Sequence, residues 1–267
     1  MKYFVMLLLA LLSFQVNAQE LFVMTEPASN MPAGSIGIRS NNMLTFKNEG
    51  GTNYHTMPEV MWGVDRNWMI HATAFMNNRQ GDLMFQGGSL YAKYRFFSSD
   101  DLHSHFRLAA YGRVSTNNAP IDQEEIETMG MNSGYETGIV ATKLINKTAI
   151  SGSVSYERAL NNNTYQFPTF QSNSAMNYTL SIGQLLHPKE YTSFKQTNVN
   201  AMVEFLGQRL NQNGKSYLDV VPSLQFIINS QARVDLAYRH QIYSDMNRIS
   251  SNSVLIKLEY TFFNVTN

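Results

Sequence analysis

Ser253-Val254-Leu255-Ile256-Lys257-Leu258-Glu259-Tyr260-Thr261-Phe262-Phe263, close to the end of the chain, is the stretch that decides the fold. From Val254 to Phe262 every even position is apolar or aromatic, and Lys257, Glu259 and Thr261 stand between them. Residues that alternate in this way lie on opposite faces of a β-strand. Such a strand either buries its apolar face in a soluble core or turns it to lipid around a polar lumen. The rest of the chain decides between these two structures.

The first eighteen residues have the pattern of a secretory signal. Lys2 supplies a positive charge, residues 4–14 form an apolar run, and residues 16–18 offer a small-residue cleavage site. The run is shorter than the about 20 residues that a membrane-spanning helix needs. We therefore predict a signal peptide over residues 1–18 and export to the cell envelope.

The composition excludes several classes of protein. The chain has no cysteine, which rules out disulfides and thiol catalysis. Lys+Arg and Asp+Glu both number 20, and this balance argues against a nucleic-acid partner. Charged residues make up 15% of the chain, against about a quarter in an average protein. A soluble β-sandwich, the alternative fold, would carry more charge on its surface than a barrel wall that faces lipid.

Twelve segments have the pattern of strands: 33–40, 57–64, 68–76, 87–97, 105–115, 134–145, 148–160, 175–187, 197–209, 216–228, 232–243 and 252–263. Tight turns alternate with connections that are mostly longer and rich in Asn, Gly and Ser, such as 41–56, and bacterial outer-membrane barrels share this arrangement. We predict an all-β fold, a single antiparallel transmembrane β-barrel of about 12 strands over residues 33–263. Residues 19–32 are predicted as an N-terminal periplasmic segment and 264–267 as a C-terminal tail.

In each strand, one set of alternate residues is mostly apolar, and we assign this set to the outer face of the barrel. The residues assigned to the outer face include no charged side chain. A Lys or Arg at the bilayer midplane would cost about 2–4 kcal/mol, so lipid demands such a surface. Aromatic residues also fall near both rims, where rings sit best in a membrane. We therefore expect the outer membrane as the location, with lipid, lipopolysaccharide and the barrel-assembly machinery as partners. Two features fit less well: Pro222 implies a bulge, and Ile139 and Val140 compete for one face.

One hairpin carries a local sequence likeness. In Pro58-Glu59-Val60-Met61-Trp62-Gly63-Val64-Asp65-Arg66-Asn67-Trp68 a strand ends in Gly-Val-Asp-Arg before an aromatic residue. The chain looks like a Bacteroidetes-type outer-membrane β-barrel. It also resembles, more loosely, the transporters named after the phenol-degradation pathway, whose early hairpin has this motif. The resemblance implies a passage for small molecules and brings no functional residue with it.

The inward parity gives a polar lumen. The candidate pore-lining residues are Lys93, Arg95, Arg107, Arg113, Glu157, Glu204, Asp219 and Asp235. A basic wall that faces a partly acidic one sets a transverse field across a channel. We expect the four basic residues to favour anions. The alternative is a narrow lumen filled by its own side chains and structural ion pairs.

These features predict a passive channel for small solutes. The rival is a non-conducting barrel used for assembly, adhesion or structure, and a lumen blocked by side chains or by residues 19–32 would favour it. Catalysis is not expected. A barrel phospholipase needs a Ser–His pair near the external rim, and His240, the one histidine predicted there, has no serine two residues away.

The same lumen face of one hairpin carries three methionines and a histidine. With a turn at 65–67, Met61 lies opposite His71, and Met69 and Met57 point the same way. Thioether and imidazole groups suit a soft ion such as Cu(I), which makes these four residues a candidate metal site. Flexible methionines also fill gaps in ordinary walls, and this is the alternative interpretation. No other cofactor is predicted.

Overall fold

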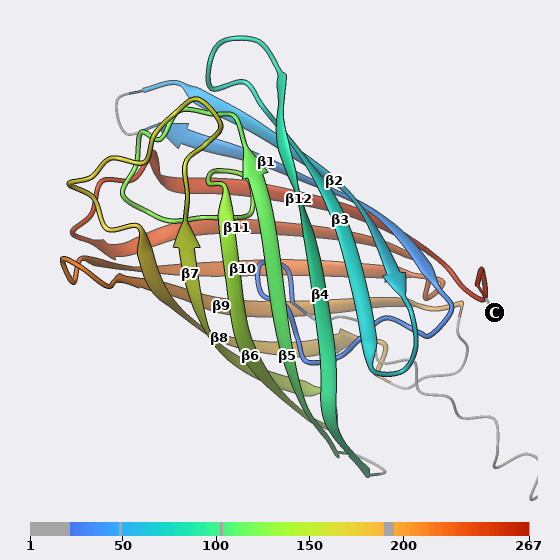
Figure 1. The fold of residues 1–267 in the computed structure, drawn as a ribbon. Coiled ribbons are helices and arrows are strands. Elements are labelled where there is room, and N and C mark those ends of the chain that lie inside the picture. Colours follow the sequence, from blue (N-terminus) through green and yellow to red (C-terminus); the bar gives the residue numbers. More distant parts are fainter. Residues whose placement is uncertain (1–21, 48–49, 102–103, 190–194, 267) are drawn as a thin grey trace, which may run out of the picture.

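The computed structural model describes residues 22–47, 50–101, 104–189 and 195–266, so the predicted signal peptide lies outside the described residues. The described strands form one closed antiparallel barrel in which β1 pairs with β12 (Figure 1). They are β1 (Ile36–Lys47), β2 (Thr52–Gly63), β3 (Trp68–Asn77), β4 (Met84–Asp101), β5 (Ser104–Asn117), β6 (Gly134–Ile145), β7 (Thr148–Ala159), β8 (Ser174–His187), β9 (Thr197–Leu210), β10 (Ser216–Ile228), β11 (Ala232–Ser244) and β12 (Ser250–Phe262). The predicted fold class is confirmed.

The predicted strands differ most from the structure in the first hairpin. Here β1 continues to Lys47 and β2 begins at Thr52, whereas the sequence predicted a long loop over 41–56. Asn42 on β1 accepts hydrogen bonds from the Tyr54 hydroxyl and from Thr56 on β2. The extension thus rests on polar contacts between strands. Polar residues give no hydrophobic alternation, so the sequence pattern stops before the strand does.

The outer surface of the barrel is apolar. Leu90, Leu180 and Leu236 belong to a large set of aliphatic side chains that are exposed on the wall. The residues that alternate with them along each strand face inward. Trp62 and Trp68 are exposed near one rim. Closure pairs the backbone groups of the wall and leaves no strand edge in lipid, as membrane-spanning strands require. This is the exterior of a transmembrane barrel.

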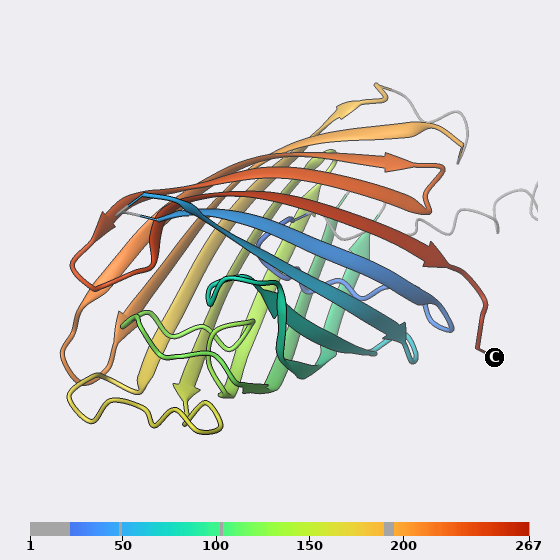
Figure 2. The same cartoon turned by 90° about the horizontal axis from the view of Figure 1, so that it is seen from above.

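The connections at one end of the barrel are mostly shorter than those at the other end. We call the end with the tight connections 64–67, 146–147 and 229–231 the turn end, and the opposite end, which carries 118–133 and 160–173, the loop end (Figures 1 and 2). The start of β1 and the end of β12 meet at the turn end, where the N–H groups of residues 265 and 266 donate to the Gly34 carbonyl. Within the described residues no helix is long and apolar enough to cross a membrane.

The two features that fitted the alternation poorly have different outcomes. The predicted bulge at Pro222 is wrong in position, because the register of β10 against β11 shifts between Leu218 and Asp219. Ile139 is 61% exposed on the outer wall, whereas Val140 is 2% exposed on the inner side. An apolar side chain in a polar lumen needs a partner there, and the inner chain described next supplies it.

Candidate functional site

Residues 22–33 run inside the barrel, and we call them the inner segment. Figures 1 and 2 both show this blue coil enclosed by the strands. Residues 22–32 were predicted as part of a periplasmic segment, and the structure places them in the lumen instead. Glu204 on β9 accepts hydrogen bonds from the N–H groups of Val23, Met24 and Thr25 at 2.8–3.1 Å. Lys257 on β12 donates to the Val23 carbonyl. Two charged wall residues therefore hold the backbone of the inner segment.

The start of the inner segment also has apolar contacts. Phe22 and Val23 pack in a buried cluster with Met202, Val221 and Leu255, which are inward-facing residues of β9, β10 and β12. Thr25 shares a hydrogen bond of 2.9 Å with the Ser181 hydroxyl on β8. Apolar positions on this part of the inner wall therefore face a peptide rather than water.

The middle of the inner segment lies against the opposite wall. Lys93 on β4 donates to the carbonyls of Pro27 and Ser29 at 2.7 and 2.8 Å. Arg107 on β5 donates to the Ser29 hydroxyl at 3.0 Å. Ala28 packs against Val140, which explains why β6 carries an apolar residue on its inner face. Both sides of the lumen thus bind the same short peptide.

The inner segment leaves the lumen past the predicted metal site. Met31 packs in a buried cluster with Met61 and Met69, and its N–H donates to the Met69 sulphur at 3.5 Å. A Cβ added to Gly63 would lie 2.2 Å from the Pro32 carbonyl oxygen. The close approach of two backbones therefore requires glycine at position 63.

The predicted pairing of Met61 with His71 is confirmed by the register of β2 and β3. The four candidate ligands do not form one isolated group. His71 lies 3.5 Å from Glu59, whereas Met57 lies close to Gly130 of a loop at the other end. Among the described residues no three His, Asp or Glu side chains converge as a metal site would need. Copper binding stays a prediction.

The connection 118–133, which we call the inward loop, descends into the lumen from the loop end. Ile126 is buried, and its N–H and carbonyl both bind the amide of Gln208 on β9. The N–H of Thr128 donates to Glu157 on β7 at 2.6 Å. The acidic stretch 122–127 of the inward loop is thus partly buried against the inner wall.

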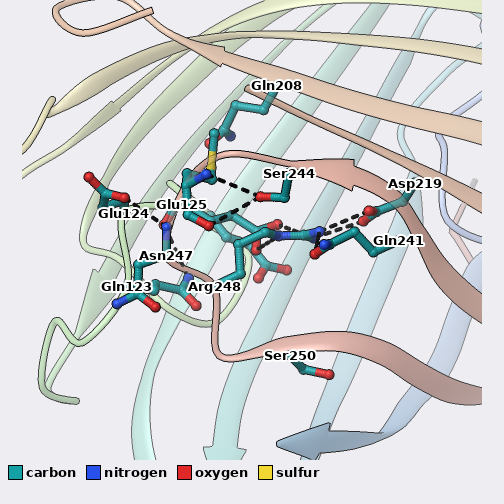
Figure 3. Close-up of polar contacts among 12 residues, drawn as sticks. Gln123, Glu124, Glu125, Gln208, Asp219, Gln241, Ser244, Asn247, Arg248 and Ser250 are labelled. Atoms are coloured by element: carbon teal, nitrogen blue, oxygen red, sulfur yellow. Dashed lines mark hydrogen bonds and ion pairs between the residues drawn. The ribbon is translucent and has the colours of Figure 1, made fainter. Parts of the chain in front are cut away.

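A network of ion pairs fixes the inward loop (Figure 3). Arg248 binds Glu125 at 2.8 Å and Asp219 at 2.7 Å, and Arg239 binds the same two carboxylates at 2.9 and 2.6 Å. The Arg248 guanidinium also lies 3.9 Å from the centre of the Tyr217 ring. Burial opposes ionisation of Glu125, yet Arg248 and Arg239 lower its pKa to about 2.

Glu127 has the opposite environment. Burial, and then the negative charge of Glu125, raise the pKa of Glu127 to about 7, although Arg239, Arg248 and Arg113 partly oppose the shift. The pKa values of two carboxyl groups only two residues apart are thus shifted in opposite directions. The two arginines stabilise the charged form of Glu125, whereas they compensate the burial of Glu127 only in part.

A cavity of about 200 Å³ lies between the inner segment and the inward loop. Its wall includes residues 24–26 of the inner segment, residues 125–129 of the inward loop, and Tyr91, Tyr111 and Tyr217 from the strands. The lining is rich in carboxylates and hydroxyl groups. The lumen thus holds a polar chamber with a peptide segment on either side.

The predicted pore-lining residues all have partners within the protein. Lys93, Arg107 and Glu204 bind the inner segment, and Glu157 binds the inward loop, as described above. Asp219 pairs with Arg239 and Arg248, the two arginines that bind Glu125 of that loop. Arg113 lies 3.6 Å from Glu136 and lines the cavity. Arg95 donates to the Arg66 carbonyl at the turn end, and Asp235 pairs with Arg233 at 3.1 Å. Two of these eight residues, Glu157 and Arg113, border the cavity.

The sequence analysis placed residues 19–32 in the periplasm, with a lumen blocked by them only as the alternative, and it did not place residues 118–133 in the lumen. One signal was available: Val140, Met202, Val221 and Leu255 are apolar although they lie on the polar parity of their strands. A water-filled lumen gives no reason for such residues. Apolar side chains on the inner parity therefore indicate a peptide inside the barrel.

Comparison with known proteins identifies the architecture. No protein-family model and no curated protein matches the chain. Among solved structures, "KdgM porin" has a TM-score of 0.51 at 8% identity, covering 85% of this chain and 99% of its own. A structure of the NanC porin has the same TM-score at 10% identity, covering 84% and 98%. At such identities the likeness shows the fold alone, which is that of an outer-membrane β-barrel.

Proposed function

We propose that the protein is an outer-membrane channel for small solutes and that the inner segment closes it in the state described. The observation that carries the proposal is the polar cavity of about 200 Å³ inside the lumen. A barrel with a purely structural role is expected to fill its interior at the density of other protein cores. A cavity with converging polar groups is the usual form of a small-molecule site.

The inner segment suits a removable closure. Wall contacts to its backbone come from Glu204, Lys257 and Lys93, and these side chains could bind water instead if the segment left. The segment is joined to the barrel at the start of β1, so it can leave the lumen without breaking the wall. Closure by a tethered peptide therefore requires no rearrangement of the strands.

The test is planar-bilayer conductance with a reversible lock. Thr25→Cys and Ser181→Cys replace two hydroxyls that lie 2.9 Å apart, in a chain without other cysteines. We expect current steps from the wild type, none from the oxidised double variant, and their return on reduction. The single-cysteine variants control for the substitutions. Absence of current from both the wild type and the reduced variant, over repeated insertions, would reject the channel.

The second candidate function is a non-conducting barrel used for assembly, adhesion or structure. Occupation of the lumen by both the inner segment and the inward loop favours it. It predicts that oxidation and reduction of the lock leave the bilayer equally silent. The same experiment therefore separates the two functions.

The surroundings of the barrel are part of the proposal. We place it in contact with lipid and lipopolysaccharide and expect the barrel-assembly machinery to insert it. The apolar outer wall supports this placement. We also propose kinship with the transporters named after the phenol-degradation pathway, which implies that the solute is a small molecule. We propose no catalytic role.

A further inference from the structure

The cavity in the lumen is lined by more acidic than basic side chains. Five carboxylates and two guanidinium groups line it: Glu26, Glu125, Glu127, Glu136 and Glu157 against Arg113 and Arg239. Both arginines already face an acid, because Arg239 binds Glu125 at 2.9 Å and Arg113 lies 3.6 Å from Glu136. Three carboxylates remain without a cation on the cavity wall. The anion preference predicted from the four basic wall residues finds no support here.

The remaining carboxylates differ in their partners. Glu26 lies 3.4 Å from Lys93, which does not line the cavity. Glu157 accepts hydrogen bonds from neutral donors, the Thr128 N–H and the Asn177 amide. The Glu127 side chain has no hydrogen-bond or ion-pair partner among the described residues. A bound cation would therefore find one free carboxylate and one that is held only by neutral groups.

The Tyr91 hydroxyl is a second, independent feature that points to a ligand in this cavity. The Tyr91 side chain is 2% exposed and borders the cavity, and its hydroxyl has no hydrogen-bond partner among the described residues. Buried polar groups are nearly always paired, so an unpaired one needs an explanation. The Tyr91 ring already has the Arg113 guanidinium 5.1 Å from its centre, and Tyr111 lies beside it at 5.8 Å. Aromatic faces next to carboxylates are the surroundings that organic cations prefer.

The size and spacing of the groups narrow the ligand further. No three acidic or imidazole groups among the described residues converge closely enough for a metal ion. The cavity of about 200 Å³ exceeds the roughly 150 Å³ that accommodates benzene in another protein. A ligand that satisfies separated carboxylates must therefore be larger than a bare ion.

We propose that this cavity binds a small organic cation, an amine attached to an apolar body the size of one ring. The inference rests on the proposed channel function and deepens it, because it names the class of solute. Glu127 and Glu157 receive the ammonium group, the Tyr91 hydroxyl accepts one of its hydrogen bonds, and the rings of Tyr91 and Tyr111 cover the apolar body.

The test measures binding to the full-length protein in detergent by isothermal titration calorimetry. The probes are 2-phenylethylamine, phenylacetate and 2-phenylethanol, which share a ring and differ in charge. We expect the amine to bind at least about tenfold more tightly than either other probe. Glu127→Gln should weaken amine binding by about tenfold, and Tyr91→Phe by about three- to tenfold. Glu124→Gln is the control, because Glu124 lies on the same loop, pairs with Lys215 and does not line the cavity.

Equal binding of the amine and phenylacetate, or unchanged amine binding in both cavity variants, would overturn the proposal. Heat-modifiable migration in gels checks that each variant is folded, and Tyr91→Phe keeps the test decisive if Glu127→Gln fails to fold. Selective amine binding to a barrel that carries no current would uphold the cation site and reject the channel. Current through a barrel that does not bind the amine selectively would uphold the channel and reject the cation site.

Discussion

Glu204→Gln should release the inner segment. Glu204 is fully buried, and its two carboxylate oxygens accept hydrogen bonds from three successive N–H groups of the segment. Glutamine keeps one oxygen and replaces the other with an amide NH₂, which is itself a donor. The N–H of Thr25, bound at 2.8 Å to the second oxygen, would then face a donor instead of an acceptor.

The expected magnitude follows from these contacts. A hydrogen bond to a charged acceptor contributes about 1.5–3 kcal/mol, and a buried donor left without a partner costs a similar amount. Losing the Thr25 contact and part of the Met24 contact should therefore cost about 3 kcal/mol in the docking equilibrium of the segment. That free energy corresponds to about a hundredfold increase in the undocked population.

The assay uses one introduced cysteine. Thr25→Cys places the single thiol of the chain at a position that is 9% exposed in the docked state. When undocking is fast relative to modification, the rate of labelling by a bulky maleimide follows the undocked population. We expect Glu204→Gln in this background to label about a hundred times faster, with a parallel rise in open-channel probability.

Asp235→Asn is the matched control. Asp235 is also a fully buried carboxylate on the inner wall, but it pairs with Arg233 rather than with the inner segment. Labelling in this control should stay near the reference rate. An unchanged rate in Glu204→Gln, or equal acceleration in both variants, would refute the view that Glu204 anchors the segment.

Other predictions concern the inward loop, the outer wall and the metal site. Arg248→Met leaves two buried acids with less compensation, should destabilise the docked loop by about 3–5 kcal/mol, and is measured by proteolysis of the loop. Because the pKa of Glu127 is raised to about 7, its proton stabilises the docked loop at low pH. That contribution is lost as pH rises from about 4.5 through 7, so proteolysis should accelerate, but not in Glu127→Gln. Leu224→Arg on the exposed wall should cost about 2–4 kcal/mol in denaturant unfolding from lipid vesicles. If the soft-metal site exists, Cu(I) binds at one site, and His71→Ala with Met61→Leu abolishes that binding; unchanged stoichiometry would remove the site.

Periodicity predicts most of the wall of this protein. The alternation of apolar and polar residues fixes which face each strand turns outward, and tight turns fix the register between neighbours. This is why the sequence correctly predicts the pairing of Met61 with His71. Errors fell where the wall is polar on both faces, as around Asn42, since such residues give no hydrophobic signal.

The contents of the lumen could not be predicted in the same way. Parity says that Lys93 and Glu204 face inward, but it does not say whether they meet water, an ion or peptide. The inner segment has no regular strand or helix, and its partners lie far away in the sequence. A charge that appears suited to a pore can equally hold a peptide backbone, and the two uses leave the same residue pattern.

The binding of Lys257 to the carbonyl of Val23 joins residues that are 234 positions apart in the chain. β12 is the last strand, and its pairing with β1 closes the barrel. The inner segment therefore reaches its full set of contacts only after the seam has formed. Without β12 the segment would keep its contacts with Glu204 and Lys93 but would lose those with Lys257 and Leu255, so we expect complete docking to follow closure of the barrel.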